Sequence, residues 1–222
     1  MILKDEITVI LTVWKRNNLS QQISQLVNQT KKPYQIWIYQ NESHLDLSIP
    51  EQVKRQFNIS VIQSRDINFK FHGRFVLPSK RNNCIVGANG RTMKSGFQDS
   101  DEQHMLALGD GKPIEKETQV DFVGHCWFLK SEWCKNLWKD RPFSWDNGED
   151  IHLAASCQIY ENIKCFVPRM PSEDRALWGD LQPHLGADEY ASWKRGTHAK
   201  LRSDIVRHWC DKGWKPMVTK EE

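Results

Sequence analysis

The stretch Ile7-Thr8-Val9-Ile10-Leu11-Thr12-Val13 decides the fold class of this chain. It is a continuous apolar and β-branched run, which is typical of a strand buried on both faces of a parallel sheet. The apolar residues that follow recur at helical spacing and predict an amphipathic helix from Leu19 to about Lys31. The chain therefore opens as an α/β protein.

The same alternation of strand and helix continues through residue 63. We expect a strand over Gln35–Tyr39, a short helix over Glu51–Phe57 and a third strand over Ile59–Gln63. This is the doubly wound pattern of nucleotide-binding sheets, in which ligands bind beyond the carboxyl ends of the strands. The segments expected at those ends are Thr12–Arg16, Gln40–Ser43 and Ser64–Asn68.

The middle of the chain is less regular. Cys84–Gly87 predicts a strand and Asn89-Gly90-Arg91 a turn, and Thr92–Glu117 is expected to be a long polar excursion over the surface. Val120–Leu129 then predicts a strand or a bent pair of strands.

The last part returns to regular spacing. Ser131 is expected to cap a helix, whose core-facing residues would be Trp133, Cys134, Leu137 and Trp138. Lys164–Val167 predicts a short strand, Pro171–Trp193 a loop-like tail and Ala199–Lys212 a final helix.

The stretch Trp145-Asp146-Asn147-Gly148-Glu149-Asp150-Ile151-His152 carries the strongest functional signal. Apolar residues recur at helical spacing from Ile151 to about Tyr160, so Glu149 and Asp150 fall in the first turn of a helix that follows a glycine turn. A helix N-terminus favours acids, so the pair also fits a purely structural role. Trp145 adds a flat apolar face beside the carboxylates, which suits a site that holds a ring and removes a proton from it.

Composition argues against several classes of protein. With 222 residues, 39% hydrophobic and 27% charged, the chain has the size and balance of one globular domain. The net charge of +3 and the scattered basic residues argue against nucleic acid as a partner. No run of 18 apolar residues occurs and Met1–Glu6 carries acids, so we expect a soluble, cytoplasmic protein without a membrane span. The six cysteines lack C-x-x-C spacing and are expected to be buried free thiols.

With these elements in order, the chain resembles the GT-A glycosyltransferases of the family-2-like kind, which use nucleotide-diphospho-sugars. The resembling segments are ITVILTVWKRNNLSQQISQLVNQTKKPYQIWIYQNES at 7–43, SRDINFKFHGRF at 64–75, VDFVGHCWFLKSEW at 120–133 and WDNGEDIHLAASCQIY at 145–160. The resemblance implies one Rossmann-like GT-A domain over 1–222 with a doubly wound mixed sheet. Its nucleotide-binding half would span 1–75 and its acceptor-binding half 84–222.

The resemblance also implies which residues contact the nucleotide-sugar donor. They are Thr12, Trp14, Asn41, Glu42, Asp66, Gly73 and Arg74. Thr12 and Trp14 would line the base and ribose. Asp66 would accept a hydrogen bond from the base, and Arg74 would meet the diphosphate. Taken singly, each of these residues also fits a turn, a helix cap or a surface cation.

The acid pair has a role in the same family. Asp150 would be the general base of an inverting enzyme, taking the proton of the acceptor hydroxyl, and Glu149 would position or tune it. Trp145, Trp127 and His125 would shape the site of a saccharide or glycan acceptor.

The metal-binding motif of the family is not where the resemblance requires it. GT-A enzymes usually hold Mn²⁺ or Mg²⁺ on the diphosphate with an Asp-x-Asp on a strand. Only Val76–Asn83, eight residues without an acid, separate Phe75 from Cys84, and a parallel crossover takes about a dozen or more. Either the protein has lost the metal-binding strand or the sequence omits a segment there. Asp99-Ser100-Asp101 has the letters of the motif but lies in the polar excursion.

Two other functions stay open at this level. The missing Asp-x-Asp favours a catalytically inactive GT-A-like module that binds carbohydrate or acts as a scaffold. A nucleotidyltransferase shares the doubly wound sheet, but that class generally has a glycine-rich loop after its first strand, and Trp14–Asn18 contains no glycine.

Overall fold

The computed structural model describes residues 7–13, 18–40, 49–63, 84–94, 105–109, 111–175 and 191–219. The chain is a mixed α/β protein that divides into two compact units, Met1–Lys80 and Arg81–Glu222. The division falls between the two halves expected from the sequence, 1–75 and 84–222. The assignment of the whole chain to a single domain stays a prediction.

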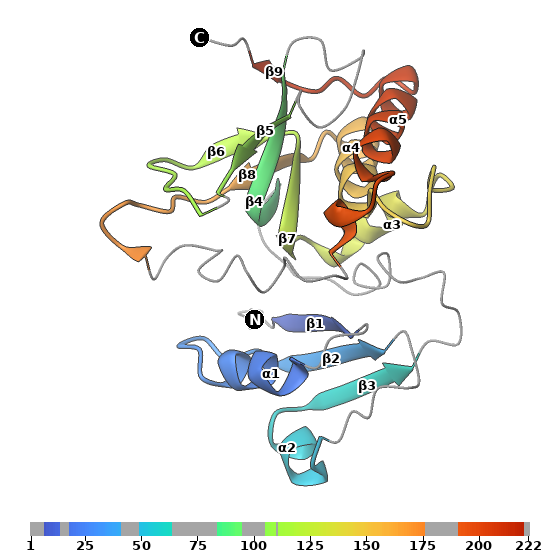
Figure 1. The fold of residues 1–222 in the computed structure, drawn as a ribbon. Helices are drawn as coiled ribbons and strands as arrows, with labels where there is room; N and C mark the ends of the chain where they lie inside the picture. The colour runs from blue at the N-terminus through green and yellow to red at the C-terminus, as the bar shows by residue number, and fades with distance from the viewer. Residues whose placement is uncertain are drawn as a thin grey trace, which may run out of the picture. The chain divides into compact units, whose positions relative to one another are not determined.

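The first unit contains a parallel sheet of three strands (Figure 1). In chain order its elements are β1 (Thr8–Val13), α1 (Leu19–Val27), β2 (Gln35–Gln40), α2 (Glu51–Gln56) and β3 (Ile59–Gln63). The strands lie in the order β1-β2-β3, and both pairings are parallel. The alternation expected from the sequence is therefore confirmed, with boundaries within a few residues of those predicted.

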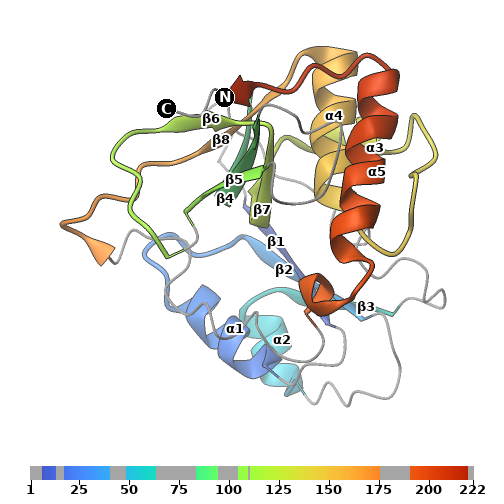
Figure 2. The ribbon, with the colours of Figure 1, turned by 45° about the horizontal axis from the view of Figure 1, so that its top comes forward.

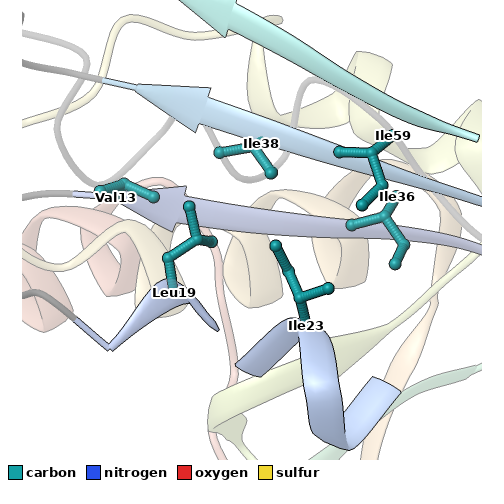
Figure 3. Packing of buried hydrophobic residues seen from close by; sticks show 6 residues of the cluster. All are labelled: Val13, Leu19, Ile23, Ile36, Ile38 and Ile59. Atoms are coloured by element: carbon teal, nitrogen blue, oxygen red, sulfur yellow. The ribbon is translucent and has the colours of Figure 1, made fainter. Parts of the chain in front are cut away.

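One apolar cluster holds α1 against this sheet (Figure 3). Leu19 and Ile23 stand one helical turn apart and point toward the strands, where they meet four strand residues. Those four are Val13, Ile36, Ile38 and Ile59, each at most 7% exposed. Helix α1 ends at Val27, four residues before the expected Lys31, and the Asn28 side chain donates to the Ser24 carbonyl of the last turn at 2.9 Å.

The second unit is built around one long strand. Its strands are β4 (Cys84–Lys94), β5 (Met105–Leu108), β6 (Thr118–Val120), β7 (Phe122–Phe128), β8 (Lys164–Val167) and β9 (Val218–Thr219). Strand β4 pairs antiparallel with β5 and β7 and parallel with β8 and β9, and β6 joins antiparallel to β8. The result is a mixed sheet, separate in its described pairings from the parallel sheet of the first unit.

The predicted turn at Asn89-Gly90-Arg91 is wrong, because β4 runs straight through it. A Cβ atom on Gly90 would lie 2.8 Å from methyl groups of Val120 and Val167, so this glycine serves close packing within the sheet. The pairing of β4 with β7 shifts register between Gly87 and Asn89, which marks a bulge in a strand of otherwise regular pairing.

The predicted irregular excursion over Thr92–Glu117 is also wrong in part. Its first residues complete β4, and β5 pairs with them. In this pairing Thr92 lies opposite Leu106, and Met93 lies opposite Met105. Strand β6 begins at Thr118 and ends at Val120. The strand or bent strand pair expected over Val120–Leu129 is confirmed as strand structure, most of it in β7.

Helices gather on one side of the second sheet (Figures 1 and 2). They are α3 (Cys134–Leu137), which follows a 3₁₀ turn over Ser131–Trp133, α4 (Glu149–Glu161) and α5 (His198–Asp211), which follows a 3₁₀ turn over Ser192–Lys194. Helices α4 and α5 run side by side in both views and are in contact. Trp138 does not point toward the core as expected: α3 ends at Leu137, and the Trp138 side chain is 42% exposed.

Helix α4 is anchored from its buried face. The ring of His152 is 2% exposed, and its Nε2–H donates to the carbonyl of Leu137 at 2.8 Å, which joins α4 to α3. Burial lowers the pKa of His152. The ring also meets that of Trp209 of α5 edge-on, with the ring centroids 4.9 Å apart.

A buried carboxylate joins the sheet to the segment after α5. Asp121 is 1% exposed and accepts the backbone N–H groups of Met93 at 2.7 Å and Met217 at 2.5 Å. Burial raises the pKa of Asp121 to about 6, although these hydrogen bonds act in the opposite direction. The carboxylate holds the chain beside β9 against β4.

The prediction of buried free thiols is only partly correct: among the described cysteines, Cys134, Cys157 and Cys165 are buried, whereas Cys84 and Cys210 are half-buried. Cys84, Cys134, Cys157, Cys165 and Cys210 are free. Burial raises the pKa of both Cys134 and Cys157 to about 12, so these thiols are poor nucleophiles. Across the described ranges, no helix combines the length and the apolar character needed to cross a bilayer.

Candidate functional site

The turn into α4 is shaped by a glycine. Gly148 caps the helix in the left-handed conformation, with φ 81° and ψ 19°, and Glu149 and Asp150 occupy the first turn as predicted. The Asn147 side-chain Oδ1 accepts the Gly148 N–H at 2.7 Å. A Cβ atom on Gly148 would lie 2.3 Å from Ile205 Cδ1 of α5, so the turn packs directly against that helix. Both the backbone angle and the packing require glycine here.

Asp150 is held by a two-point ion pair. Arg202 of α5 donates from Nη1 to Asp150 Oδ1 at 3.0 Å and from Nη2 to Oδ2 at 2.9 Å. The two side chains are only 10% and 13% exposed, so the pair is largely shielded from water and salt. The Ile151 N–H also donates to Oδ1 at 2.9 Å. Two parallel guanidinium bonds fix the plane of the carboxylate as well as its position.

Two further side chains complete the network around this pair. Arg202 Nη1 also donates to Asn147 Oδ1 at 3.3 Å, and its guanidinium lies 5.2 Å from the centre of the Phe122 ring. Asn147 Nδ2 lies 2.6 Å from Nδ1 of His198, and both residues are 7% exposed. Four polar side chains from the turn, α4 and α5 thus form one largely buried cluster: Asn147, Asp150, His198 and Arg202.

Glu149 is buried beside this cluster, with 7% of its surface exposed. A buried acid in the first turn of a helix benefits from the positive end of the helix dipole, which is the structural role that the sequence already allowed. Its expected part in positioning or tuning Asp150 stays a prediction.

The three residues expected to shape the acceptor site lie on two segments of the second unit: one precedes α4, and the other two belong to β7. Trp145 is half-buried on the stretch that leads into α4, and Trp127 is half-buried on β7 opposite Gly87 of β4. His125 belongs to β7, but its side chain lies outside the described residues. Their role toward an acceptor stays a prediction.

On the donor side, the described residues include Thr12. It is the penultimate residue of β1, at the carboxyl end of the strand, and pairs in register with Tyr39 of β2. The other expected donor residues lie outside the described ranges: Trp14, Asn41, Glu42, Asp66, Gly73 and Arg74. The short junction Val76–Asn83 and the Asp99-Ser100-Asp101 sequence lie outside them as well.

The expected Mn²⁺ or Mg²⁺ finds no ligand set in the part of the chain that the structure describes. Within those ranges, no three His, Cys, Asp or Glu side chains are grouped so that they would hold a metal ion. The Asp99-Ser100-Asp101 sequence and the junction where the motif was expected lie outside those ranges, so the metal stays a prediction of the resemblance.

Sequence reasoning missed Asn147, His198 and Arg202 as partners of the acid pair. His198 and Arg202 are four residues apart and so share one face of α5, together with the buried Ile205 and Trp209. Ionisable residues on the apolar face of an amphipathic helix are rarely buried without a partner. The spacing of His198 and Arg202 on this face was therefore a signal in the sequence that they have buried polar partners. The expected helix began at Ala199, which left His198 outside it.

Comparisons with known proteins place no further constraint on this site. No model of a protein family matches the sequence, and no curated protein matches it either.

Proposed function

We propose that this chain is an inverting glycosyltransferase that moves a sugar from a nucleotide-diphospho-sugar to a saccharide or glycan acceptor. The observation that carries the proposal is the carboxylate of Asp150, held in a fixed plane by Arg202 in the first turn of α4 and still 13% exposed. A general base has to be aligned with its substrate, and the two-point ion pair that fixes the plane of this carboxylate supports that role.

The proposed chemistry assigns one step to Asp150. An acceptor hydroxyl gives its proton to the Asp150 carboxylate while the hydroxyl oxygen forms a bond to the anomeric carbon of the donor. The bond from that carbon to the diphosphate oxygen breaks, and its electron pair leaves with the nucleoside diphosphate. General base catalysis of this kind contributes about 10²- to 10⁴-fold to the rate. The charge that develops on the diphosphate needs cationic stabilisation, for which Arg74 is the candidate of this chain.

The first unit supports the donor half of the proposal. Its parallel strands are joined by α1 and α2, as in nucleotide-binding α/β sheets, where ligands bind beyond the carboxyl ends of the strands. Thr12 lies at such an end.

A thermal-shift screen tests the donor half. The full chain is melted with uridine, guanosine, cytidine and thymidine diphosphates, each with and without Mn²⁺. A ligand that binds only the folded state raises the melting temperature. One nucleotide is expected to do so, and Asp66→Ala is expected to weaken its binding by about 1 to 3 kcal/mol. No response to any nucleotide would count against a donor site.

Asp150→Asn tests the catalytic half. We expect the variant to lose at least about 100-fold in transfer of sugar from the nucleotide-sugar identified by the screen, because Asn has no basic oxygen. Nucleotide affinity should be unchanged. Asp204→Asn is the matched control, since Asp204 lies on α5 and forms ion pairs with Lys200 and Arg207 away from the cluster. Transfer near the wild-type rate in Asp150→Asn would remove Asp150 from the role of base.

One observation also favours a second candidate, a catalytically inactive module that binds carbohydrate. The same ion pair of Asp150 with Arg202 is what a purely structural link between α4 and α5 would require. Nucleotide-sugar hydrolysis by the wild-type chain in the presence of Mn²⁺ separates the candidates, because an inactive module releases no nucleoside diphosphate above background.

A further inference from the structure

The orientation of the Asn147 amide is determined by its neighbours. The Gly148 N–H and Arg202 Nη1 can only donate, and both point to the same side-chain atom, at 2.7 Å and 3.3 Å. That atom must be the oxygen Oδ1. The amide group Nδ2 therefore faces His198 as a donor, at 2.6 Å from Nδ1.

This orientation also determines the state of the imidazole. Nδ1 of His198 has to accept the hydrogen bond from Asn147, so the ring is neutral and carries its proton on Nε2. The folded arrangement of the cluster is thus compatible with only one of the three protonation forms of His198.

We propose that His198 is a positioning residue that makes Asp150 pH-sensitive: protonation of the ring breaks the hydrogen bond from Asn147 and loosens the Asn147–Arg202–Asp150 arrangement. The inference rests on the proposed function of Asp150 as a base. It assigns a regulation by acid to that site.

The physical reason is a conflict between donors. A protonated ring has N–H groups at both nitrogens, so an N–H of the ring would face the N–H groups of Asn147 across 2.6 Å. His198 and Asn147 are each 7% exposed, so water has little access to relieve the conflict. If the amide turns over to present its oxygen to the ring, the Gly148 N–H and Arg202 lose their acceptor. Either movement disturbs Asn147 and Arg202, and Arg202 is the residue that holds Asp150.

Charged residues of both signs lie on the described segments around the cluster. The charged residues on these segments include Glu149 and Asp150 of α4, Arg202 of α5 and Arg195, whose backbone carbonyl accepts the His198 N–H at 2.9 Å. Asp150 is already neutralised by Arg202.

Two-dimensional NMR of the full chain, labelled with ¹⁵N, tests the coupling without any activity. At pH 8 the ring ¹⁵N shifts of His198 should report the form with its proton on Nε2. As the pH falls to 5, the backbone amide of Gly148 should shift with the same midpoint as the His198 ring, because it donates to the Asn147 oxygen. A Gly148 amide that does not follow His198, or a ring that carries its proton on Nδ1 at pH 8, would overturn the proposal.

Two variants sharpen the test. His198→Asn places an acceptor that does not titrate near the position of Nδ1, so the Gly148 amide should become independent of pH over this range. Asn147→Asp replaces the donor by a carboxylate oxygen, so the ring should stay protonated to higher pH than in the wild type. His208→Asn is the control, because His208 lies near the other end of α5 against Phe143, and Gly148 should titrate as in the wild type.

The rate of sugar transfer separates this inference from the proposed function. In the wild type the transfer rate should fall about tenfold for each pH unit below the midpoint of His198 protonation. In His198→Asn this decrease in rate at low pH should be absent. An identical decrease in both proteins would overturn the regulation. If Gly148 follows His198 but the wild type transfers no sugar at any pH, the coupling stands as structure and the proposed function fails.

Discussion

The tightest packing constraint near the proposed base is at Gly148, and its replacement by alanine gives a quantitative test. Two effects add at this position. An L-residue in the left-handed conformation, here φ 81°, costs about 1 to 2 kcal/mol. The new methyl group would lie 2.3 Å from Ile205 Cδ1, and overpacking of a buried contact costs about 1 to 3 kcal/mol more. We expect Gly148→Ala to lower the free energy of unfolding by about 3 kcal/mol in total.

Gly111→Ala separates the two effects. Gly111 also has a positive φ, 68°, but a Cβ atom there meets no atom within 4 Å. This variant should show the backbone strain alone, about 1 to 2 kcal/mol. The difference between the two variants measures the clash with Ile205.

A double-mutant cycle tests whether Ile205 is the cause. Ile205→Val removes Cδ1, and the next side-chain atom, Cγ1, would lie 3.4 Å from the alanine methyl group. In the wild type this truncation should cost about 0.5 to 1.5 kcal/mol, but in Gly148→Ala it should restore stability. We expect a coupling energy of at least about 1 kcal/mol between the two sites.

Urea unfolding followed by tryptophan fluorescence supplies the measurement. Two of the ten tryptophans, Trp14 and Trp37, belong to Met1–Lys80, so the signal comes mainly from the unit that contains Gly148. Free energies are compared at unchanged slope of the unfolding curve. The reasoning is refuted if Gly148→Ala costs no more than Gly111→Ala, or if Ile205→Val costs the same in both backgrounds.

The remaining predictions are checked by the same urea experiment. Arg202→Met should cost about 3 kcal/mol because it leaves the Asp150 carboxylate without its ion pair, and adding Asp150→Asn should recover much of that loss. For Asp121, the pKa of about 6 in the folded state exceeds the ordinary 3.8, so its contribution to stability is fully present below about pH 4 and is lost as the pH rises through 6. Relative to Asp121→Asn, the wild type should therefore gain on the order of 3 kcal/mol between pH 7 and pH 4. Gly90→Ala should cost about 1 to 3 kcal/mol through overpacking, whereas Gly196→Ala, where a Cβ meets nothing within 4 Å, should stay within about 0.5 kcal/mol of the wild type.

Each of these has a contrary outcome. An Arg202→Met variant as stable as the wild type would make the ion pair energetically neutral. A difference between wild type and Asp121→Asn that does not change with pH would mean that Asp121 has an ordinary affinity for protons. An unaffected Gly90→Ala variant would mean that the sheet gives way to the methyl group without strain.

The sequence by itself determined those elements whose signal is local. The apolar run at 7–13, the helical spacing from Leu19 and the alternation through Gln63 predicted β1, α1, β2, α2 and β3, because the spacing of apolar residues within each segment is a local property of the sequence. The start of α4 was predicted for the same reason: apolar residues recur at helical spacing from Ile151, and acids are enriched in the first turn of a helix.

Tertiary structure decided the features that depend on distant partners. Gly90 signals a turn when its own segment is considered, yet it lies within β4 because Val120 and Val167 need the space that a side chain would fill. Trp138 fits the helical spacing of its neighbours but follows the end of a helix only four residues long, so its ring is exposed.

The environment of the candidate base belongs to the same class of features. Asp150 was identifiable from the turn that precedes it, but Arg202 is 52 residues further along the chain, and Asn147 meets His198 across 51. No local periodicity encodes such pairs, because they form only once α4 and α5 pack side by side. The sequence determined where the carboxylates lie on their helix, and the packing of the two helices decided that Asp150 is bound by Arg202 and that Asn147 lies against the His198 ring.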